Sequence, residues 1–191
     1  MAYVSTDPTT FGSRPPVLVR AALAAARRVS GEDLDTLGAM AHRQGVLLPW
    51  MLLEAGTMRM KSVLPGELAE LVVFVVANRL GCSWCIDYSS ARWECSGLDP
   101  SRLEAAARWR ERPEAFDATS LAAFAFAEAV CADPLEDTSM LAATLGELVG
   151  EQGVVEVAYW AALENLRSRF NAALGLTSQG FADRCRPVTR A

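Results

Sequence analysis

The sequence feature that most restricts the fold is an apolar segment that ends at a glycine. Residues 65–81, PGELAELVVFVVANRLG, begin with a proline that can open a helix and end with Gly81, which can close one. The valines leave a buried β-strand as an alternative, because β-branched side chains favour strands. The length of the segment and its flanking residues favour a helix. A second helix is then predicted over residues 82–97, CSWCIDYSSARWECSG, ending at Gly97.

Similar start and stop signals recur along the chain. Asp99 and Asp117 are placed to cap the helices that follow them. Residues 46–64 are predicted as a helix followed by a loop, because Pro49 and Gly56 interrupt them. The other predicted helices cover residues 16–31, 32–45, 100–112, 117–133, 138–150, 154–175 and, in the tail, 178–185.

Composition agrees with a helical fold. Half of the residues are hydrophobic, and alanine is abundant while strand-favouring threonine and tyrosine are few. A chain of 191 residues suits one domain with a substantial core. The sequence therefore predicts an all-α, single-domain bundle over residues 16–191, preceded by a flexible arm over residues 1–15.

Charge and hydropathy exclude several classes of partner. The formal net charge of −5 gives no basic footprint for nucleic acid or acidic lipid. The longest apolar run, residues 71–77, is far shorter than the roughly 18 residues that a membrane-spanning helix needs. The N-terminus also lacks the basic start and apolar stretch of a secretory signal. We therefore expect a soluble, cytoplasmic protein with neither a nucleic-acid nor a membrane partner.

Two cysteines stand out among the five of the chain. An odd number of scattered cysteines does not resemble a secreted disulfide framework. Cys82 and Cys85 fall in the first turn of the predicted second helix, close enough to form a disulfide. The positive end of that helix favours thiolate over thiol, and each cysteine offers the other a resolving partner. The pair is a candidate redox dithiol, and the alternative is two buried small hydrophobic side chains.

A zinc site is the other chemical interpretation of this pair. Zinc needs four ligands, typically two cysteine pairs or one pair with histidines. His42 is the only histidine of the chain. A four-sulfur site would have to be formed by Cys82, Cys85, Cys95 and Cys185. The dithiol interpretation requires no metal or organic cofactor.

Glu70 is the second candidate in this segment. On a helix, its neighbours at three, four and seven positions onward are apolar, namely Val73, Phe74 and Ala77. A partly buried carboxylate there would suit a group that gives and takes a proton near neutral pH. The alternative is an ordinary first-turn acid that the helix dipole stabilises.

Together these residues resemble the core motif of the alkylhydroperoxidase D group, within the carboxymuconolactone decarboxylase superfamily. The motif, a glutamate twelve positions before the first of two cysteines in Cys-x-x-Cys, covers residues 65–97 here. Weaker likeness extends from about residue 60 to 176. The resemblance implies an all-helical fold, usually a homo-oligomer, with thiol-dependent peroxidase or disulfide-exchange activity. Its substrate would be a hydroperoxide or a small disulfide, and an external dithiol would be the reductant.

The resemblance also implies roles for individual residues. By position, Cys85 would be the peroxidatic cysteine, Cys82 the resolving cysteine that exchanges with the reductant, and Glu70 the start of a proton relay. The family's usual histidine, four residues after the second cysteine, is replaced by Ser89. Some members carry a histidine between the cysteines, where this chain has Trp84.

These departures leave the relay incomplete. The hydroxyl of Ser89 can donate a hydrogen bond to a thiolate, but it cannot act as a base at pH 7. Tyr88 or Asp87 could partly substitute, although a packed ring and a solvated acid are their structural alternatives. Trp84 would either pack over the dithiol and limit water entry or serve as an ordinary core or interface tryptophan. Only tertiary folding could bring His42 to the site.

Three functions follow from the sequence. The preferred one is a peroxidase, slowed because acid–base help typically contributes about 10² to 10⁴ in rate. The alternative from another class is a non-catalytic family member that retains the fold for binding or oligomer formation. Decarboxylase chemistry matches poorly, because that branch relies on histidine and does not call for a vicinal dithiol.

Overall fold

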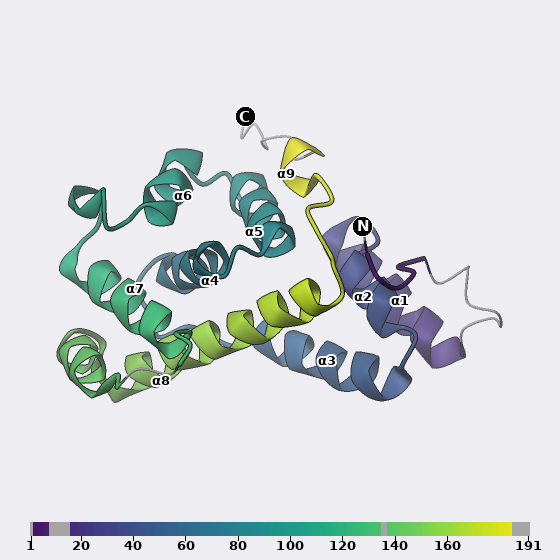
Figure 1. Ribbon diagram of the computed structural model, residues 1–191, viewed down its shortest axis with the longest axis horizontal. Helices are drawn as coiled ribbons and strands as arrows, with labels where there is room; N and C mark the ends of the chain where they lie inside the picture. Colours follow the sequence, from purple (N-terminus) through teal and green to yellow (C-terminus); the bar gives the residue numbers. More distant parts are fainter. Residues whose placement is uncertain (1, 8–15, 135–136, 185–191) are drawn as a thin grey trace. The chain divides into compact units, whose positions relative to one another are not determined.

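The computed structural model describes residues 2–7, 16–134 and 137–184, and every regular element in these ranges is helical (Figure 1). The all-α prediction is therefore confirmed. In chain order the helices are α1 (Val17–Ser30), α2 (Asp35–Met40), α3 (Gln44–Thr57), α4 (Leu68–Arg79), α5 (Ser83–Cys95), α6 (Pro100–Ala107), the 3₁₀ turn η2 (Pro113–Ala115), α7 (Ala118–Val130), α8 (Ser139–Ala173) and α9 (Phe181–Arg184).

The internal contacts divide the chain into two compact units. Unit 1 contains Met1–Lys61 and Asn171–Thr177, and unit 2 contains Ser62–Phe170 and Ser178–Ala191. Each unit is described by itself below. The prediction of one domain over residues 16–191 stays a prediction, as does the flexible arm, most of which (residues 8–15) lies outside the described residues.

Unit 1 contains α1, α2 and α3. Gly31, at φ 84°, ends α1 where the sequence predicts. Residues 46–64 contain the end of a helix followed by a loop, as expected, but Pro49 lies inside α3 and does not interrupt it. Proline removes only one donor from the helical ladder, and the turns on either side keep their own hydrogen bonds.

The described N-terminal residues 2–7 pack within unit 1. The backbone N–H of Tyr3 donates to the carbonyl oxygen of Leu174 at 2.8 Å. Gly38 lies directly against the carbonyl of Thr6, leaving no room for a Cβ. His42 contacts the same segment, with Nε2 2.9 Å from the carbonyl oxygen of Ser5. His42 is exposed and makes this local contact at the surface.

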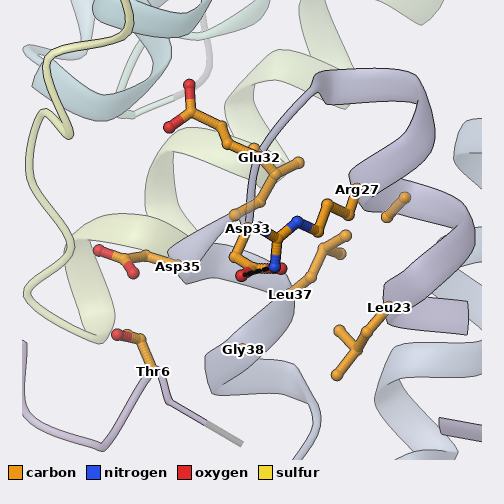
Figure 2. Close-up of a pocket in the computed structure, with 10 residues that line it drawn as sticks. Thr6, Leu23, Arg27, Glu32, Asp33, Asp35, Leu37 and Gly38 are labelled. Carbon is orange, nitrogen blue, oxygen red and sulfur yellow. Dashed lines mark hydrogen bonds and ion pairs between the residues drawn. The ribbon is translucent and has the colours of Figure 1, made fainter. Parts of the chain in front are cut away.

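Unit 1 also contains a small pocket between Thr6, α1 and α2 (Figure 2). Arg27 and Asp33 form an exposed ion pair at its edge, with Nη1 and Oδ2 2.9 Å apart. The pocket volume is about 60 Å³. Sites for small organic ligands typically measure about 300–1,000 Å³, so this pocket has room for water rather than for a substrate.

Unit 2 is built around α4. This helix is apolar on most sides, with Leu71, Val72, Val75 and Val76 almost completely buried. A helix that is hydrophobic all round must be central. Figure 1 shows it beside α5, α6 and α7, all of which contact it. The strand alternative for this segment is therefore wrong.

Two helix ends of unit 2 differ from the sequence prediction. Gly66 adopts a φ of 52°, so α4 begins at Leu68 instead of Pro65. The other helix, α6, ends at Ala107 instead of residue 112. Just beyond that end, Trp109 packs against Phe124 of α7, with ring centroids 5.9 Å apart. This tertiary contact outweighs the helix propensity of residues 108–112.

The last long helix, α8, contains one break. Gly150 has φ 70° and ψ 175°, so the element consists of two helices joined at this glycine. This agrees with the separate helices predicted over residues 138–150 and 154–175. Neither α8 nor any other helix in the described ranges is long and apolar enough to cross a membrane.

Candidate active site

The two cysteines of the motif are joined at the start of α5. Gly81, at φ 67°, ends the preceding turn, and the N–H of Cys82 bonds the carbonyl oxygen of Ala77 at 3.0 Å. Cys82 is the N-cap residue of α5, and its sulfur accepts the backbone N–H of Cys85 at 3.2 Å. The Cα atoms are 5.3 Å apart, and the sulfurs form a disulfide. The sequence therefore places a disulfide at the positive end of a helix.

Both sulfur residues are largely buried, but not equally. Cys82 is 7% exposed and Cys85 is 3% exposed. The less exposed Cys85 lies three residues further along, in the first turn of the helix, and contacts Ser168 of α8. Of the two, Cys82 is therefore the better placed to meet a molecule that arrives from solvent.

A serine on α8, which the sequence reasoning missed, contacts Cys85. The Ser168 hydroxyl lies 3.5 Å from Cys85 Sγ and 3.1 Å from Glu164 Oε1. Ser168 and Glu164 are each only 2% exposed. Arg167 pairs with the same carboxylate, with Nη1 3.4 Å from Glu164 Oε2. The Ser168 hydroxyl thus lies within contact distance of both a buried carboxylate and the sulfur of Cys85.

A pattern in α8 could have revealed these residues. Val157, Ala161, Glu164 and Ser168 are all buried and are spaced by four, three and four residues. That spacing marks one face of a helix. The face is apolar at first and then carries a carboxylate and a hydroxyl, which are unusual in a core. Polar residues in a core-facing register are the signal that points to this site.

The structure gives Ser89 no comparable contact. Ser89 is half-buried on α5, and its hydroxyl bonds no residue in the described part of the chain. The hydroxyl at the sulfur of Cys85 is that of Ser168. The relay role of Ser89 stays a prediction.

Glu70 lies in the first turn of α4 and is exposed. Its carboxylate forms no hydrogen bond with any residue in the described ranges. The exposed first-turn location of Glu70 matches the alternative of an ordinary first-turn acid. A relay that begins at Glu70 stays a prediction.

Asp87 anchors the C-terminal segment that precedes and begins α9. Its carboxylate accepts hydrogen bonds from the Ser178 hydroxyl and from the backbone N–H groups of residues 179–182, at distances of 2.7 to 3.1 Å. Burial alone would raise the pKa of Asp87. The hydrogen bonds from Ala182, Ser178 and the other donors outweigh it, so the pKa is lowered from its ordinary value of 3.8. The residue is neither solvated nor bonded to the sulfurs.

An aromatic cluster adds to this attachment. Trp84 stacks on Tyr88 with ring centroids 5.2 Å apart, and Phe181 packs edge-on against both rings. The indole N–H of Trp84 donates to Gln179 Oε1 at 2.8 Å. The packed-ring alternative for Tyr88 therefore describes what the structure contains. Trp84 holds the C-terminal segment beside the dithiol.

The remaining cysteines do not extend the site in the described ranges. Cys131 is a buried thiol outside any disulfide, and burial raises its pKa to about 11. Among the described residues, no group of three or more histidine, cysteine, aspartate or glutamate side chains could hold a metal ion. Cys185, the fourth sulfur of the zinc alternative, lies outside the described residues.

Comparisons with known proteins agree with this fold. The family model described as "Carboxymuconolactone decarboxylase family" matches residues 44–129. The chain is 29% identical to the uncharacterized protein YnjA of Escherichia coli (strain K12) over 123 residues, which are 64% of this chain and 67% of YnjA.

Solved structures share the fold at low identity. An uncharacterized peroxidase-related protein from Ralstonia eutropha JMP134, described as an alkylhydroperoxidase AhpD core, is 16% identical with a TM-score of 0.80. That match covers 95% of this chain and 94% of the other. The apo debrominase Bmp8 is 17% identical with a TM-score of 0.75, over 87% and 89% of the two chains. Both are similar to this chain in architecture.

Proposed function

We propose that this chain, whose residues 44–129 match the carboxymuconolactone decarboxylase family model, is a member of that family and that its Cys82–Cys85 pair makes it a thiol-dependent peroxidase. The observation that carries the proposal is a disulfide formed at the N-terminus of α5, with a buried hydroxyl at the sulfur of Cys85. A helix N-terminus stabilises thiolate, which is the nucleophilic form of cysteine.

The proposed cycle begins with the reduced pair. The Cys85 thiolate attacks the terminal oxygen of a hydroperoxide, and the O–O bond breaks. A proton reaches the departing alkoxide, so an alcohol leaves and Cys85 becomes a sulfenic acid. The Cys82 thiol then attacks the sulfur of Cys85, water leaves, and the disulfide forms. The hydroperoxide is reduced and the dithiol is oxidised by the same two electrons.

An external dithiol completes the cycle. The greater exposure of Cys82 supports it as the sulfur that this reductant attacks, with Cys85 as the leaving thiolate. The position of Cys85 beside the Ser168 hydroxyl suits a leaving group that carries negative charge. A small disulfide as the oxidant and assembly into a homo-oligomer stay expectations from the resemblance.

The absence of a histidine at position 89 favours the rival, a family member without catalysis. Without an imidazole beside Cys85, a peroxidase must find its proton donor elsewhere. The rival predicts a disulfide that is structural or regulatory. The rival therefore predicts slower oxidation of the cysteine pair by hydroperoxide and no catalytic turnover.

Intact-mass analysis of the reduced protein tests the proposal. After one equivalent of hydroperoxide we expect a rapid loss of two mass units, localised to Cys82 and Cys85, which Cys85→Ser abolishes. The matched control is Cys131→Ser, which removes a buried thiol away from the pair and should retain the loss. Slow or unlocalised oxidation, with no turnover in the presence of any dithiol, would support the non-catalytic rival.

A further inference from the structure

We propose that Ser168 and Glu164 form the proton relay of Cys85 and take the place of the missing imidazole; this rests on the proposed peroxidase function. Glu164 is a carboxylate inside the core of unit 2, with 2% of its surface exposed. A buried charge is costly unless other groups compensate it. Arg167 and Ser168 compensate the charge of Glu164. Ser168 also contacts the sulfur of Cys85.

The hydroxyl of Ser168 has two acceptors but one hydrogen. It can donate to Glu164 Oε1 at 3.1 Å or to Cys85 Sγ at 3.5 Å, but not to both at once. A disulfide sulfur is a weak acceptor, so in the oxidised protein the hydrogen bonds the carboxylate. The oxygen of Ser168 then has lone pairs available to a thiol hydrogen on Cys85.

Reduction of the disulfide therefore creates a directed chain. The Cys85 S–H donates to Ser168 Oγ, and the Ser168 O–H donates to the Glu164 carboxylate. If both hydrogens shift along the chain, Cys85 becomes a thiolate and Glu164 a neutral carboxylic acid. Ser168 ends with one hydrogen, as it began, and now donates to the thiolate.

The same chain returns the proton during peroxide cleavage. The thiolate attacks the terminal peroxide oxygen, and an alkoxide forms beside Ser168. The hydroxyl of Ser168 gives its proton to the alkoxide and takes one from the carboxyl group of Glu164. The products are an alcohol, a sulfenic acid on Cys85 and an ionised Glu164, so all protons are accounted for. Ser168 is the catalytic group and Glu164 acts through it.

Arg167 gives the relay its resting state. Its guanidinium lies 3.4 Å from Glu164 Oε2, on the oxygen that does not face Ser168. The ion pair favours the ionised carboxylate before and after the reaction. Because Oε1 remains directed at Ser168, the ion pair does not block the proton path.

The rates of two reactions at the Cys85 sulfur test the relay. In reduced protein at pH 7, we would measure hydroperoxide-driven sulfenic acid or disulfide formation at Cys85, and alkylation of Cys85 by iodoacetamide. Both reactions need the thiolate, but only the first needs a proton for its leaving group. In Ser168→Ala and Glu164→Gln, the ratio of the peroxide rate to the alkylation rate should fall at least about 10-fold.

The Gln variant separates a relay from simple electrostatics. Removing the negative charge of Glu164 favours the Cys85 thiolate, so an electrostatic role alone predicts a faster peroxide reaction. The relay predicts a peroxide reaction that is slower relative to alkylation, because the ratio of the two rates cancels any change in the amount of thiolate. Ser90→Ala on α5 and Glu151→Gln on α8 are matched controls that should keep the wild-type ratio.

The outcomes distinguish the two proposals. If wild-type Cys85 reacts with hydroperoxide and both variants keep the wild-type ratio, the relay is wrong and the peroxidase proposal stands. If wild-type Cys85 is alkylated but never oxidised by hydroperoxide, the proposed function is wrong, and the relay with it. Circular dichroism verifies folding, and Ser168→Ala, which removes a single oxygen, decides the question if Glu164→Gln does not fold.

Discussion

Cys82 and Cys131 cap helices of unit 2 at opposite ends. Cys82 is the N-cap residue of α5, and its sulfur accepts a backbone N–H. Cys131 is the C-cap residue of α7, and its thiol donates to the carbonyl oxygen of Ala161 at 3.5 Å. The two are similarly buried, at 7% and 4% exposed. The two therefore differ little in exposure, and they differ in the end of the helix that each occupies.

The helix end sets the chemistry available to each sulfur. A helix N-terminus presents N–H groups that stabilise negative charge, and a C-terminus presents carbonyl oxygens that oppose it. Burial raises the pKa of Cys131 to about 11, so this thiol stays neutral near pH 7. A buried cysteine can thus be inert packing or a redox centre, depending on which backbone groups face it. Three changes test this contrast.

The largest effect is expected from Asp87→Ala, which removes the anchor beside the dithiol and leaves Cys131 untouched. The backbone donors of residues 179–182 lose a charged acceptor, so the free energy of unfolding should fall by about 2–4 kcal/mol. Reduction of the Cys82–Cys85 disulfide by a small dithiol should become faster. Chemical denaturation and reduction kinetics measure the two effects.

The exposed Asp183 offers a control for this change, since Asp183→Ala should alter stability by less than about 0.5 kcal/mol. The contribution of Asp87 also depends on pH. Its pKa is lowered on folding, so the stabilisation is present above its ordinary value of 3.8 and is lost as pH falls through the lower folded value. Equal stability of Asp87→Ala and Asp183→Ala at neutral pH would show that Asp87 does not stabilise the C-terminal segment.

An intermediate effect is expected from alkaline pH, and it belongs to Cys131 alone. The thiol pKa rises from 9.0 to about 11 on folding. Between these values the unfolded chain binds fewer protons than the folded one, so stability decreases as pH rises. The loss should approach about 2–3 kcal/mol by pH 11. Urea denaturation at pH 8 and pH 11 would show this loss in the wild type and its absence in Cys131→Ala; identical pH dependence in both would contradict it.

The smallest effect is expected from Trp84→Phe, which retains an aromatic ring but loses the hydrogen bond to Gln179. The free energy of unfolding should decrease by about 0.5–1.5 kcal/mol. Gln179→Ala should cost a similar amount, and the double variant should cost less than the sum, because the two residues share one bond. Fully additive losses would show that this bond does not hold the C-terminal segment.

Local signals made the start of the dithiol helix predictable. Gly81 ends the preceding turn and Cys82 begins α5, because both depend on residues within one turn. Asp99 and Asp117 cap α6 and α7 for the same reason. Each of these helix ends depends on hydrogen bonds between near neighbours. Glycine, proline and acidic residues mark such ends in the sequence.

The α8 part of the site could not be found in this way. Ser168 contacts a cysteine 83 positions earlier in the chain, and no local rule relates the two. The family motif directed attention to Ser89, which lies one turn from Cys85 along the same helix. The premature end of α6 has a similar origin, because Trp109 leaves the helix to pack on α7. Contacts distant in sequence decide both.

The break at Gly150 has a consequence for how this protein can tolerate change. In an unbroken helix, each inserted residue rotates everything after it by about 100° around the axis. The non-helical φ and ψ of Gly150 interrupt that coupling. Insertions or deletions before Gly150 can therefore be absorbed there, while Glu164 and Ser168 keep their orientation toward Cys85. The chain before Gly150 can therefore change in length without rotating Glu164 and Ser168 away from Cys85.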